Sequence, residues 1–225
     1  MPAILFVLTS ASKTLGGRDT GWYLSEAAHP YYILAPHFTI DFASPAGPNP
    51  PPDPDSIKDL VNDADSVKFL NDETVKSKLA TTKKLSEVNE KDYLAIFYAG
   101  GLGPVLDLAS DPTNAKLASQ FYQAKKITAA VCHGPAALVK AVDASGKSIF
   151  SGKNLTGFSN TEEEIGGKGK EIPFLLEDAI IALGGKYEKA PEPWGVKVVV
   201  DGHLITGQNP ASAGGVGRAI LEALM

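Results

Sequence analysis

The hydrophobic positions of the chain fall into short runs separated by polar and amphipathic stretches. Short apolar runs predict strands, and those without a polar side are typical of parallel strands covered on both faces. The predicted strands cover residues 3–8, 38–43, 93–98, 127–131, 154–158, 186–189, 196–200 and 203–207. The first predicted helix starts at residue 19 or 20 and stops before Pro30. Further helices are predicted over residues 56–61, 73–79, 113–124, 173–183 and 211–224.

This alternation of strands and helices predicts an α/β fold. We expect one doubly wound domain over residues 1–225, built on a mostly parallel sheet that is flanked by helices. Asp201-Gly202 is typical of a tight hairpin turn, so a late antiparallel hairpin is added to the parallel sheet.

One stretch combines a strand, a sharp turn and a predicted helix around Cys132, the only cysteine in the chain. The strand at 127–131 runs directly into Gly134-Pro135, where a helix is predicted to begin. This arrangement is that of a nucleophile elbow, in which the turn residue projects above a helix N-terminus. The positive end of a helix favours a thiolate, so we expect a lowered pKa for Cys132. The alternative, a small buried apolar cysteine, is less favoured because His133 is adjacent.

Three other segments carry candidate chemistry. Glu26 is predicted in the last turn of its helix among apolar neighbours, an unfavourable place for a carboxylate. A solvated surface glutamate is the alternative. The glycines of 99–104 allow a loop that presents N–H groups to an oxyanion, or simply form a turn. Glu162, Glu163 and Glu164 follow Ser159, and helix capping explains such a group without any catalytic role.

Composition restricts the partners. Hydrophobic residues make up 44% of the 225 residues, charged residues 21%, and the net charge is −5, so we expect no nucleic-acid partner. No apolar run approaches the length of a membrane span and no signal peptide is recognised, so we expect a soluble cytoplasmic protein, with the nucleus as a further location. The other histidines, His29, His37 and His203, are scattered, and neither a metal site nor a cofactor is predicted.

Five segments together resemble the ThiJ/PfpI superfamily, which has a class I glutamine amidotransferase-like, flavodoxin-like fold. They are 131–135, 99–103, 25–30, 156–159 with Glu163, and 204–212. Within the superfamily they are similar to the heat-shock branch, the glutathione-independent glyoxalases (glyoxalase III). The chain departs from that branch at Leu102, where a histidine is usual, and in the short stretch 164–172. Leu102 removes any polar contact from that position, and the short stretch bears on pocket size and substrate preference.

The resemblance implies an enzyme that converts methylglyoxal, a small 2-oxoaldehyde, to D-lactate without glutathione or metal (D-lactate dehydratase, a hydro-lyase). It implies that the Cys132 thiolate attacks the aldehyde and that His133 acts as general base and acid, oriented by Glu163. Spacing from Gly157 favours Glu163, with Glu162 as the alternative. Glu26, with a raised pKa, would assist proton transfer. Gly100, Gly101 and His133 are the expected oxyanion donors, and a homodimer is the expected assembly.

Other functions on the same fold stay open at this point. They are a non-catalytic stress chaperone, a redox sensor that uses oxidation of Cys132, and a protein deglycase. A glutamine amidotransferase is excluded because it requires a late His-x-Glu pair, whereas Ile205 stands two positions after His203. Nothing in the sequence indicates the peptide-binding cleft of a peptidase.

Overall fold

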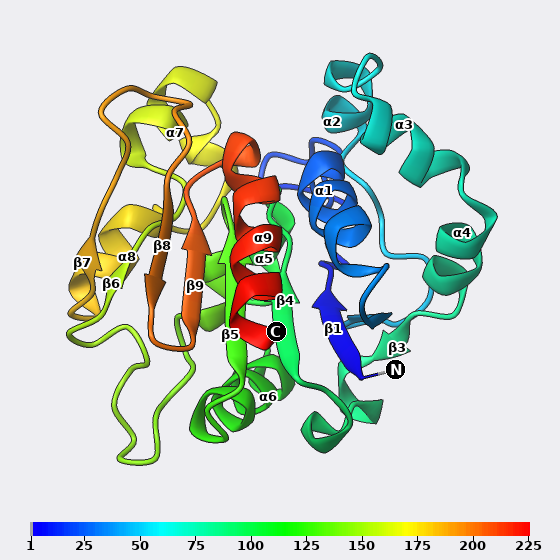
Figure 1. Cartoon of the computed structure of the whole chain (residues 1–225). Helices are drawn as coiled ribbons and strands as arrows, with labels where there is room; N and C mark the ends of the chain where they lie inside the picture. The colour runs from blue at the N-terminus through cyan, green and yellow to red at the C-terminus, as the bar shows by residue number, and fades with distance from the viewer. Residues whose placement is uncertain (1) are drawn as a thin grey trace.

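The computed structural model describes residues 2–225 and is built on a central seven-stranded sheet (Figure 1). Its strand order is β3-β2-β1-β4-β5-β9-β8, and every neighbouring pair is parallel except β8 and β9. The strands are β1 (Ala3–Val7), β2 (Thr39–Ser44), β3 (Lys83–Lys84), β4 (Ala95–Tyr98), β5 (Ile127–Val131), β8 (Val198–Asp201) and β9 (Leu204–Gly207). A separate parallel pair consists of β6 (Asn154–Leu155) and β7 (Lys186–Tyr187).

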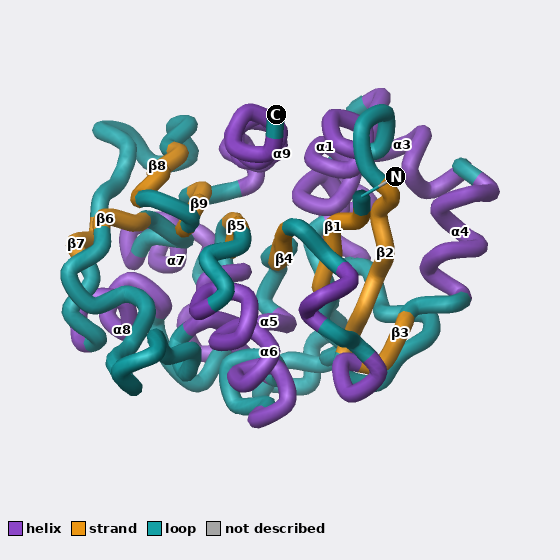
Figure 2. Tube along the Cα trace, turned by 60° about the horizontal axis from the view of Figure 1, so that its bottom comes forward, coloured by secondary structure: helices purple, strands orange, loops and turns teal. Residues whose placement is uncertain are grey.

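Helices cover both faces of the sheet, with α1 and α9 on one face and α5, α6 and α8 on the other (Figure 2). The α-helices are α1 (Leu24–Leu34), α2 (Pro54–Asp59), α3 (Ala64–Asn71), α4 (Glu73–Ala80), α5 (Gly103–Leu106), α6 (Pro112–Gln123), α7 (Asn160–Gly166), α8 (Leu176–Ala182) and α9 (Ala213–Leu224). The 3-10 helices are η1 (Leu85–Glu87), η2 (Glu90–Asp92), η3 (Gly134–Leu138), η4 (Gly169–Glu171) and η5 (Pro210–Ser212). The predicted doubly wound sheet with a late antiparallel hairpin is thus confirmed.

The core explains why these strands form. Every residue of β4 and β5 is buried, as are four of the five residues of β1. Because both faces of these strands are covered, their sequences are apolar on both faces and do not alternate with polar residues. The carboxyl ends of parallel strands share one edge of the sheet, where open α/β folds place their sites. In Figure 1 this edge is at the top, close to α2 and α7. The residues that follow β4 and β5 therefore meet beside each other.

The helix that carries Glu26 differs from its prediction at both ends. Residues before Leu24 are held extended, with the Trp22 amide donating to Pro51 O at 3.1 Å and the Tyr23 amide to Gly100 O at 3.1 Å. The helix then continues through Pro30, whose Cα would lie 2.9 Å from a Cβ at Gly217 of α9. This close packing between two helices retains a proline that would otherwise end the helix. Glu26 consequently lies in the first turn of α1 and not in the last.

The element after Cys132 is also shorter than predicted. A helix begins at Gly134 with Pro135 in its first turn, as predicted, but it is the 3-10 helix η3 and ends at Leu138 without continuing into an α-helix. In addition, α3 was not predicted, and β6 pairs with β7 outside the central sheet. These differences lie at the sheet's periphery or in its connections and leave the strand order of the core unaffected.

Candidate active site

The turn at Cys132 is left-handed. Cys132 follows β5 directly and has φ 60°, a conformation that non-glycine residues rarely adopt and that is found at functional turns. Its amide donates to Gly207 O at 2.9 Å, which ties the turn to the end of β9. A Cβ at Gly134 would lie 2.4 Å from the Tyr98 carbonyl oxygen, so glycine is required for the chain to leave the strand here.

This turn brings His133 into contact with the thiol. The Cys132 Sγ lies 3.5 Å from His133 Nδ1, whereas neighbouring side chains on a regular strand would point to opposite faces. The other ring nitrogen, Nε2, lies 2.7 Å from Glu163 Oε2 on α7. An ionised carboxylate only accepts hydrogen bonds, so Nε2 carries the proton and Nδ1 is left as an acceptor for the thiol. The three side chains form one buried chain of contacts.

The neighbouring glutamate has a different environment. Glu162 is fully buried, and its carboxylate accepts hydrogen bonds from the Ser159 hydroxyl at 2.7 Å, from the Trp194 amide at 2.9 Å and from Asn209 Nδ2 at 2.8 Å. Burial acts to raise its pKa, but the hydrogen bonds from Asn209 and Ser159 hold that pKa below the ordinary value. Glu162 closes the N-terminus of α7 in a capping box with Ser159 and holds the loop at Trp194. Glu163 is thus the glutamate in contact with His133.

Glu26 faces the elbow from the other side. It is fully buried, and its Oε2 accepts a hydrogen bond from the Gly100 amide at 2.7 Å. No described residue lies within hydrogen-bonding distance and angle of its Oε1, but the carboxyl group interacts with the Cys132 thiol. Burial raises the pKa of Glu26 to about 8, so at neutral pH the group is mostly a neutral acid. The raised pKa is thus caused by burial, not by the helix C-terminus that the sequence suggested.

The expectation of a lowered pKa for Cys132 is wrong. Burial of the thiol, which is 3% exposed, and the adjoining Glu26 raise the pKa of Cys132, while the N–H groups of Gly101 and His133 act in the opposite direction. Only the five-residue 3-10 helix η3 follows the elbow, and its positive end does not offset the effect of burial. Below about pH 8 Glu26 keeps its proton, which removes the repulsion between a carboxylate and a thiolate.

Gly100 and Gly101, in the loop after β4, have different contacts. The Gly101 and His133 amides interact with the Cys132 sulfur, whereas the Gly100 amide donates to Glu26. A Cβ at position 100 would lie 2.5 Å from Glu26 Oε2 and 2.8 Å from the Cys132 Cβ. Gly100 therefore allows Glu26 to approach the elbow, and its assignment as an oxyanion donor is not supported by this geometry.

A cavity of about 150 Å³ opens over these groups. It is smaller than the sites of drug-sized ligands, about 300–1,000 Å³, and suits a small substrate. One wall is apolar and contains Leu102, Phe158 and Trp194. The Phe158 ring centroid lies 4.3 Å from that of His133 and 5.5 Å from that of Trp194. Sequence reasoning did not find Trp194, and its only local signal is a tryptophan in a Pro-Gly-rich loop.

The remaining lining residues come from distant segments, which no local motif reveals. They are Tyr23, Asp53, Asp59, Gly166, Lys168 and Pro210. Between residues 2 and 225, no three His, Cys, Asp or Glu side chains are grouped so that they could hold a metal ion. None of the helices described there has the length and apolar character needed to cross a membrane.

The chain is similar to known proteins over nearly all of its length. Its sequence matches the DJ-1/PfpI family over residues 25–223. The glutathione-independent glyoxalase HSP31 of Saccharomyces cerevisiae is 33% identical, covering 98% of this chain and 97% of that protein. The X-ray structure of the 24 kDa rapid encystment protein of Francisella tularensis is 37% identical, covers both chains fully and has a TM-score of 0.94. The crystal structure of glyoxalase III from Candida albicans is 28% identical, covers 99% and 97% of the two chains and has a TM-score of 0.86.

Proposed function

The chain belongs to the DJ-1/PfpI family, and on that premise we propose that it is a glutathione-independent glyoxalase that converts methylglyoxal and water to lactate. The observation that carries the proposal is the buried contact chain from Cys132 through His133 to Glu163 beside a small cavity, with the buried Glu26 carboxyl group against the Cys132 thiol. These are the groups needed for covalent capture of an aldehyde and for proton transfer between two adjacent carbons.

The first step is attack of sulfur on the aldehyde carbon. His133 Nδ1, 3.5 Å from Sγ, accepts the thiol proton, and the resulting imidazolium is stabilised by Glu163 at 2.7 Å. A C–S bond forms while the carbonyl π bond breaks, which places the electron pair on oxygen. The Gly101 and His133 amides stabilise this oxyanion, and protonation gives a hemithioacetal.

The second stage moves a proton from the former aldehyde carbon to the neighbouring ketone carbon. His133 removes the proton, and the neutral acid Glu26 donates to the developing enediolate. The His133 imidazolium then protonates the second carbon while the hydroxyl group on the first carbon returns a proton to Glu26, which yields a thioester with a new hydroxyl group on the second carbon. Water then cleaves the C–S bond, which releases lactate and regenerates the thiol. One methylglyoxal and one water give one lactate, so no oxidant or reductant is required.

The finer assignments belong to the same proposal. We assign the product as D-lactate, the reaction as that of a hydro-lyase run toward hydration, and the assembly as a cytoplasmic homodimer of single-domain chains. The family resemblance supports each of these. Chiral chromatography of the product tests the first, and light scattering after size-exclusion chromatography tests the assembly.

The central experiment measures methylglyoxal loss and lactate formation with no glutathione added. We expect turnover in the native protein and a fall of roughly 10³-fold or more in kcat/KM for Cys132→Ala, because the covalent step is lost. Circular dichroism of the variant checks that it is folded. Unchanged turnover in a folded Cys132→Ala protein would eliminate the covalent mechanism, and absence of turnover in the native protein would eliminate the glyoxalase proposal.

A further inference from the structure

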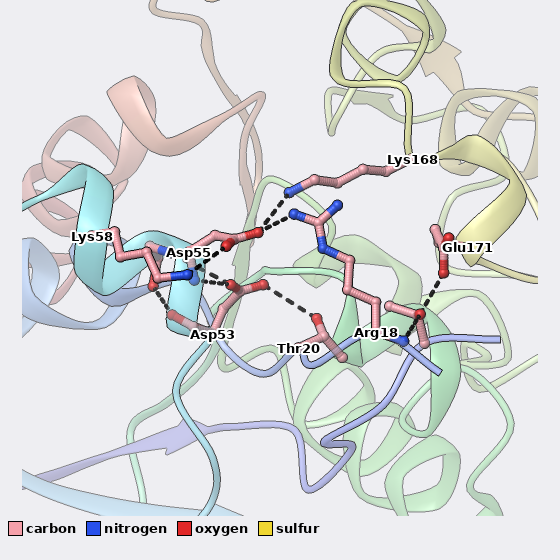
Figure 3. Close-up of polar contacts among 9 residues, drawn as sticks. Arg18, Thr20, Asp53, Asp55, Lys58, Lys168 and Glu171 are labelled. Atoms are coloured by element: carbon pink, nitrogen blue, oxygen red, sulfur yellow. Dashed lines mark hydrogen bonds and ion pairs between the residues drawn. The ribbon is translucent and has the colours of Figure 1, made fainter. Parts of the chain in front are cut away.

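A group of charged side chains, one of which lines the cavity, links three segments of the chain (Figure 3). Asp55, in the first turn of α2, accepts a hydrogen bond from the Arg18 guanidinium. Lys168, from the segment after α7, reaches across toward the same carboxylate, with 3.8 Å between Nζ and Oδ2. In Figure 3 the Arg18 and Lys168 side chains both extend toward Asp55 from segments far apart in the sequence. We call Arg18, Asp55 and Lys168 the mouth strap.

One member of the mouth strap borders the cavity that contains Cys132. Lys168 is itself part of the cavity lining, together with Asp53 and Asp59 at the two ends of α2 and Cys132 at the bottom. An ion pair between Lys168 and Asp55 therefore joins the α7 side of the mouth to the α2 side. Cys132 lines the same cavity as Lys168 and is only 3% exposed, so a molecule reaches the sulfur through a cavity that Lys168 borders.

The loop that supplies Arg18 is fastened on its other side as well. The Glu171 carboxylate accepts hydrogen bonds from the Thr14 hydroxyl and from the Gly16 amide, and the Leu15 amide donates to Glu171 O at 3.0 Å. The Arg18 amide in turn donates to the Thr14 hydroxyl at 3.1 Å. The loop at 14–18 and the segment at 168–171 thus form one unit, and the contacts with Asp55 are what connect this unit to α2.

We propose that the mouth strap limits the size of the aldehyde that reaches Cys132, so that the site selects two- and three-carbon 2-oxoaldehydes over longer ones. The proposal rests on the proposed function for its substrate, but the barrier itself is a property of the cavity mouth. The Lys168 and Asp55 side chains are each 31% exposed and that of Arg18 is 47% exposed. Exposed ion pairs are weak, so each pair should slow the entry of a longer molecule by no more than about fivefold.

Because Cys132 is the only cysteine, its alkylation reports access without any turnover. The probes are iodoacetamide and an uncharged iodoacetamide that carries a bulky N-substituent, and the measured quantity is the ratio of their rate constants. For Lys168→Met we expect the bulky reagent to react about two- to fivefold faster and iodoacetamide to change by less than about twofold. Asp55→Asn, which removes the partner of both cations, should have at least as large an effect.

The matched control is Lys58→Met. Lys58 Nζ lies 3.5 Å from Asp55 Oδ1, but both residues belong to α2, so their pair does not cross the mouth. This variant removes one positive charge beside Asp55 and should leave the ratio of rates unchanged. Raising the salt concentration from about 0.1 M to about 1 M, which shortens the Debye length from ~10 Å to ~3 Å, should speed the bulky reagent in the native protein but not in Asp55→Asn, which lacks both ion pairs.

Equal acceleration of both reagents in Lys168→Met would overturn the proposal, because it would mean that the loops loosen without any selection by size. No acceleration of either reagent in both Lys168→Met and Asp55→Asn would overturn it as well. The kinetic counterpart is a rise in kcat/KM for a six-carbon 2-oxoaldehyde relative to methylglyoxal. If the native protein lacks glyoxalase turnover while alkylation behaves as expected, the proposed function fails and the size barrier stands.

Discussion

The reactive centre and the mouth above it are built from the same kinds of charged side chains, but in opposite ways. At the centre, Glu26, His133 and Glu163 are at most 5% exposed, and each contacts a partner in a fixed geometry. At the mouth, Arg18, Asp55 and Lys168 are exposed by about a third or more. Burial raises the pKa of Glu26 and favours its neutral form, whereas the Arg18 guanidinium lowers the pKa of the more exposed Asp55 and keeps it charged in pairs that are weak.

This contrast separates chemistry from access. A buried group whose pKa is raised, such as Glu26, can hold a proton for transfer at neutral pH. An exposed pair can only bias how often a passage is open, and it does so by a few-fold. Substitutions at the centre should therefore change the rate of chemistry by orders of magnitude and the pH dependence with it. Substitutions at the mouth should change mainly which molecules enter.

The largest effect is expected for Glu26→Gln. We predict a fall of roughly 10²- to 10⁴-fold in kcat, because an amide cannot supply the proton that the neutral acid donates. In the native protein kcat/KM should fall as the pH rises above about 8, where Glu26 loses its proton. That descending limb should be absent from the variant's profile. An identical pH profile in both proteins would show that Glu26 does not titrate in the reaction.

The same residue should also affect stability. Its folded pKa of about 8 exceeds the ordinary 4.5, so between these values the folded state binds more protons than the unfolded state. The contribution of Glu26 to stability is thus fully present below pH 4.5 and is lost as the pH rises through 8. Urea unfolding of the native protein should show a loss of about 1.4 kcal/mol per pH unit within this window that Glu26→Gln lacks. Parallel pH dependences would contradict the buried neutral acid.

The adjacent glutamates provide the next test. Glu163→Gln should reduce kcat by about 10²-fold with little change in stability, because it removes the charge that stabilises the His133 imidazolium. Glu162→Gln should instead reduce the free energy of unfolding by about 1–3 kcal/mol and raise KM, since Ser159, Trp194 and Asn209 all bind its carboxylate. Steady-state kinetics and urea unfolding of the two variants together decide this. Reversed effects would reassign the third acid.

The strand and turn that carry Cys132 could be predicted from the sequence more closely than the segments around them, for a physical reason. The short apolar run at residues 127–131 is typical of a buried strand, and β5 forms there. The small Gly134 indicates the turn that follows. Glu163 was separated from Glu162 only by spacing, because both occupy the first turn of one helix and local sequence cannot tell which way a side chain points. Coordinates distinguish them by their partners.

The incorrect predictions have one common cause, which is tertiary packing. The helix at Glu26 passes Pro30 because α9 packs against it at a glycine, and the thiol pKa is raised because burial outweighs the nearby amides. The cavity lining joins Tyr23, Leu102, Phe158, Lys168 and Trp194, which share no periodicity or spacing. Rims made of long-range contacts between exposed loops have no local signature in a single sequence.

A smaller effect on activity is expected at Gly100, where the absence of a side chain leaves room for Glu26. Gly100→Ala would place a Cβ 2.5 Å from Glu26 Oε2 and 2.7 Å from Val131 O, so we predict a loss of about 1–3 kcal/mol in stability together with reduced kcat. Gly214→Ala in α9 is the control, because its Cβ meets nothing closer than 3.5 Å and alanine favours a helix. Urea unfolding should show the two substitutions changing stability in opposite directions.

The smallest effect should come from the apolar wall that joins the two regions. Trp194 has φ 64°, is 45% exposed and packs edge-on against Phe158, which in turn lies against His133. Trp194→Ala removes apolar surface beside the substrate without touching a reacting group. We predict a rise of about two- to tenfold in KM for methylglyoxal with kcat nearly unchanged, since one methyl group gains only about 0.8 kcal/mol by burial. A fall in kcat comparable to that of Glu163→Gln would place Trp194 with the chemistry, and the division between centre and mouth would then fail at this wall.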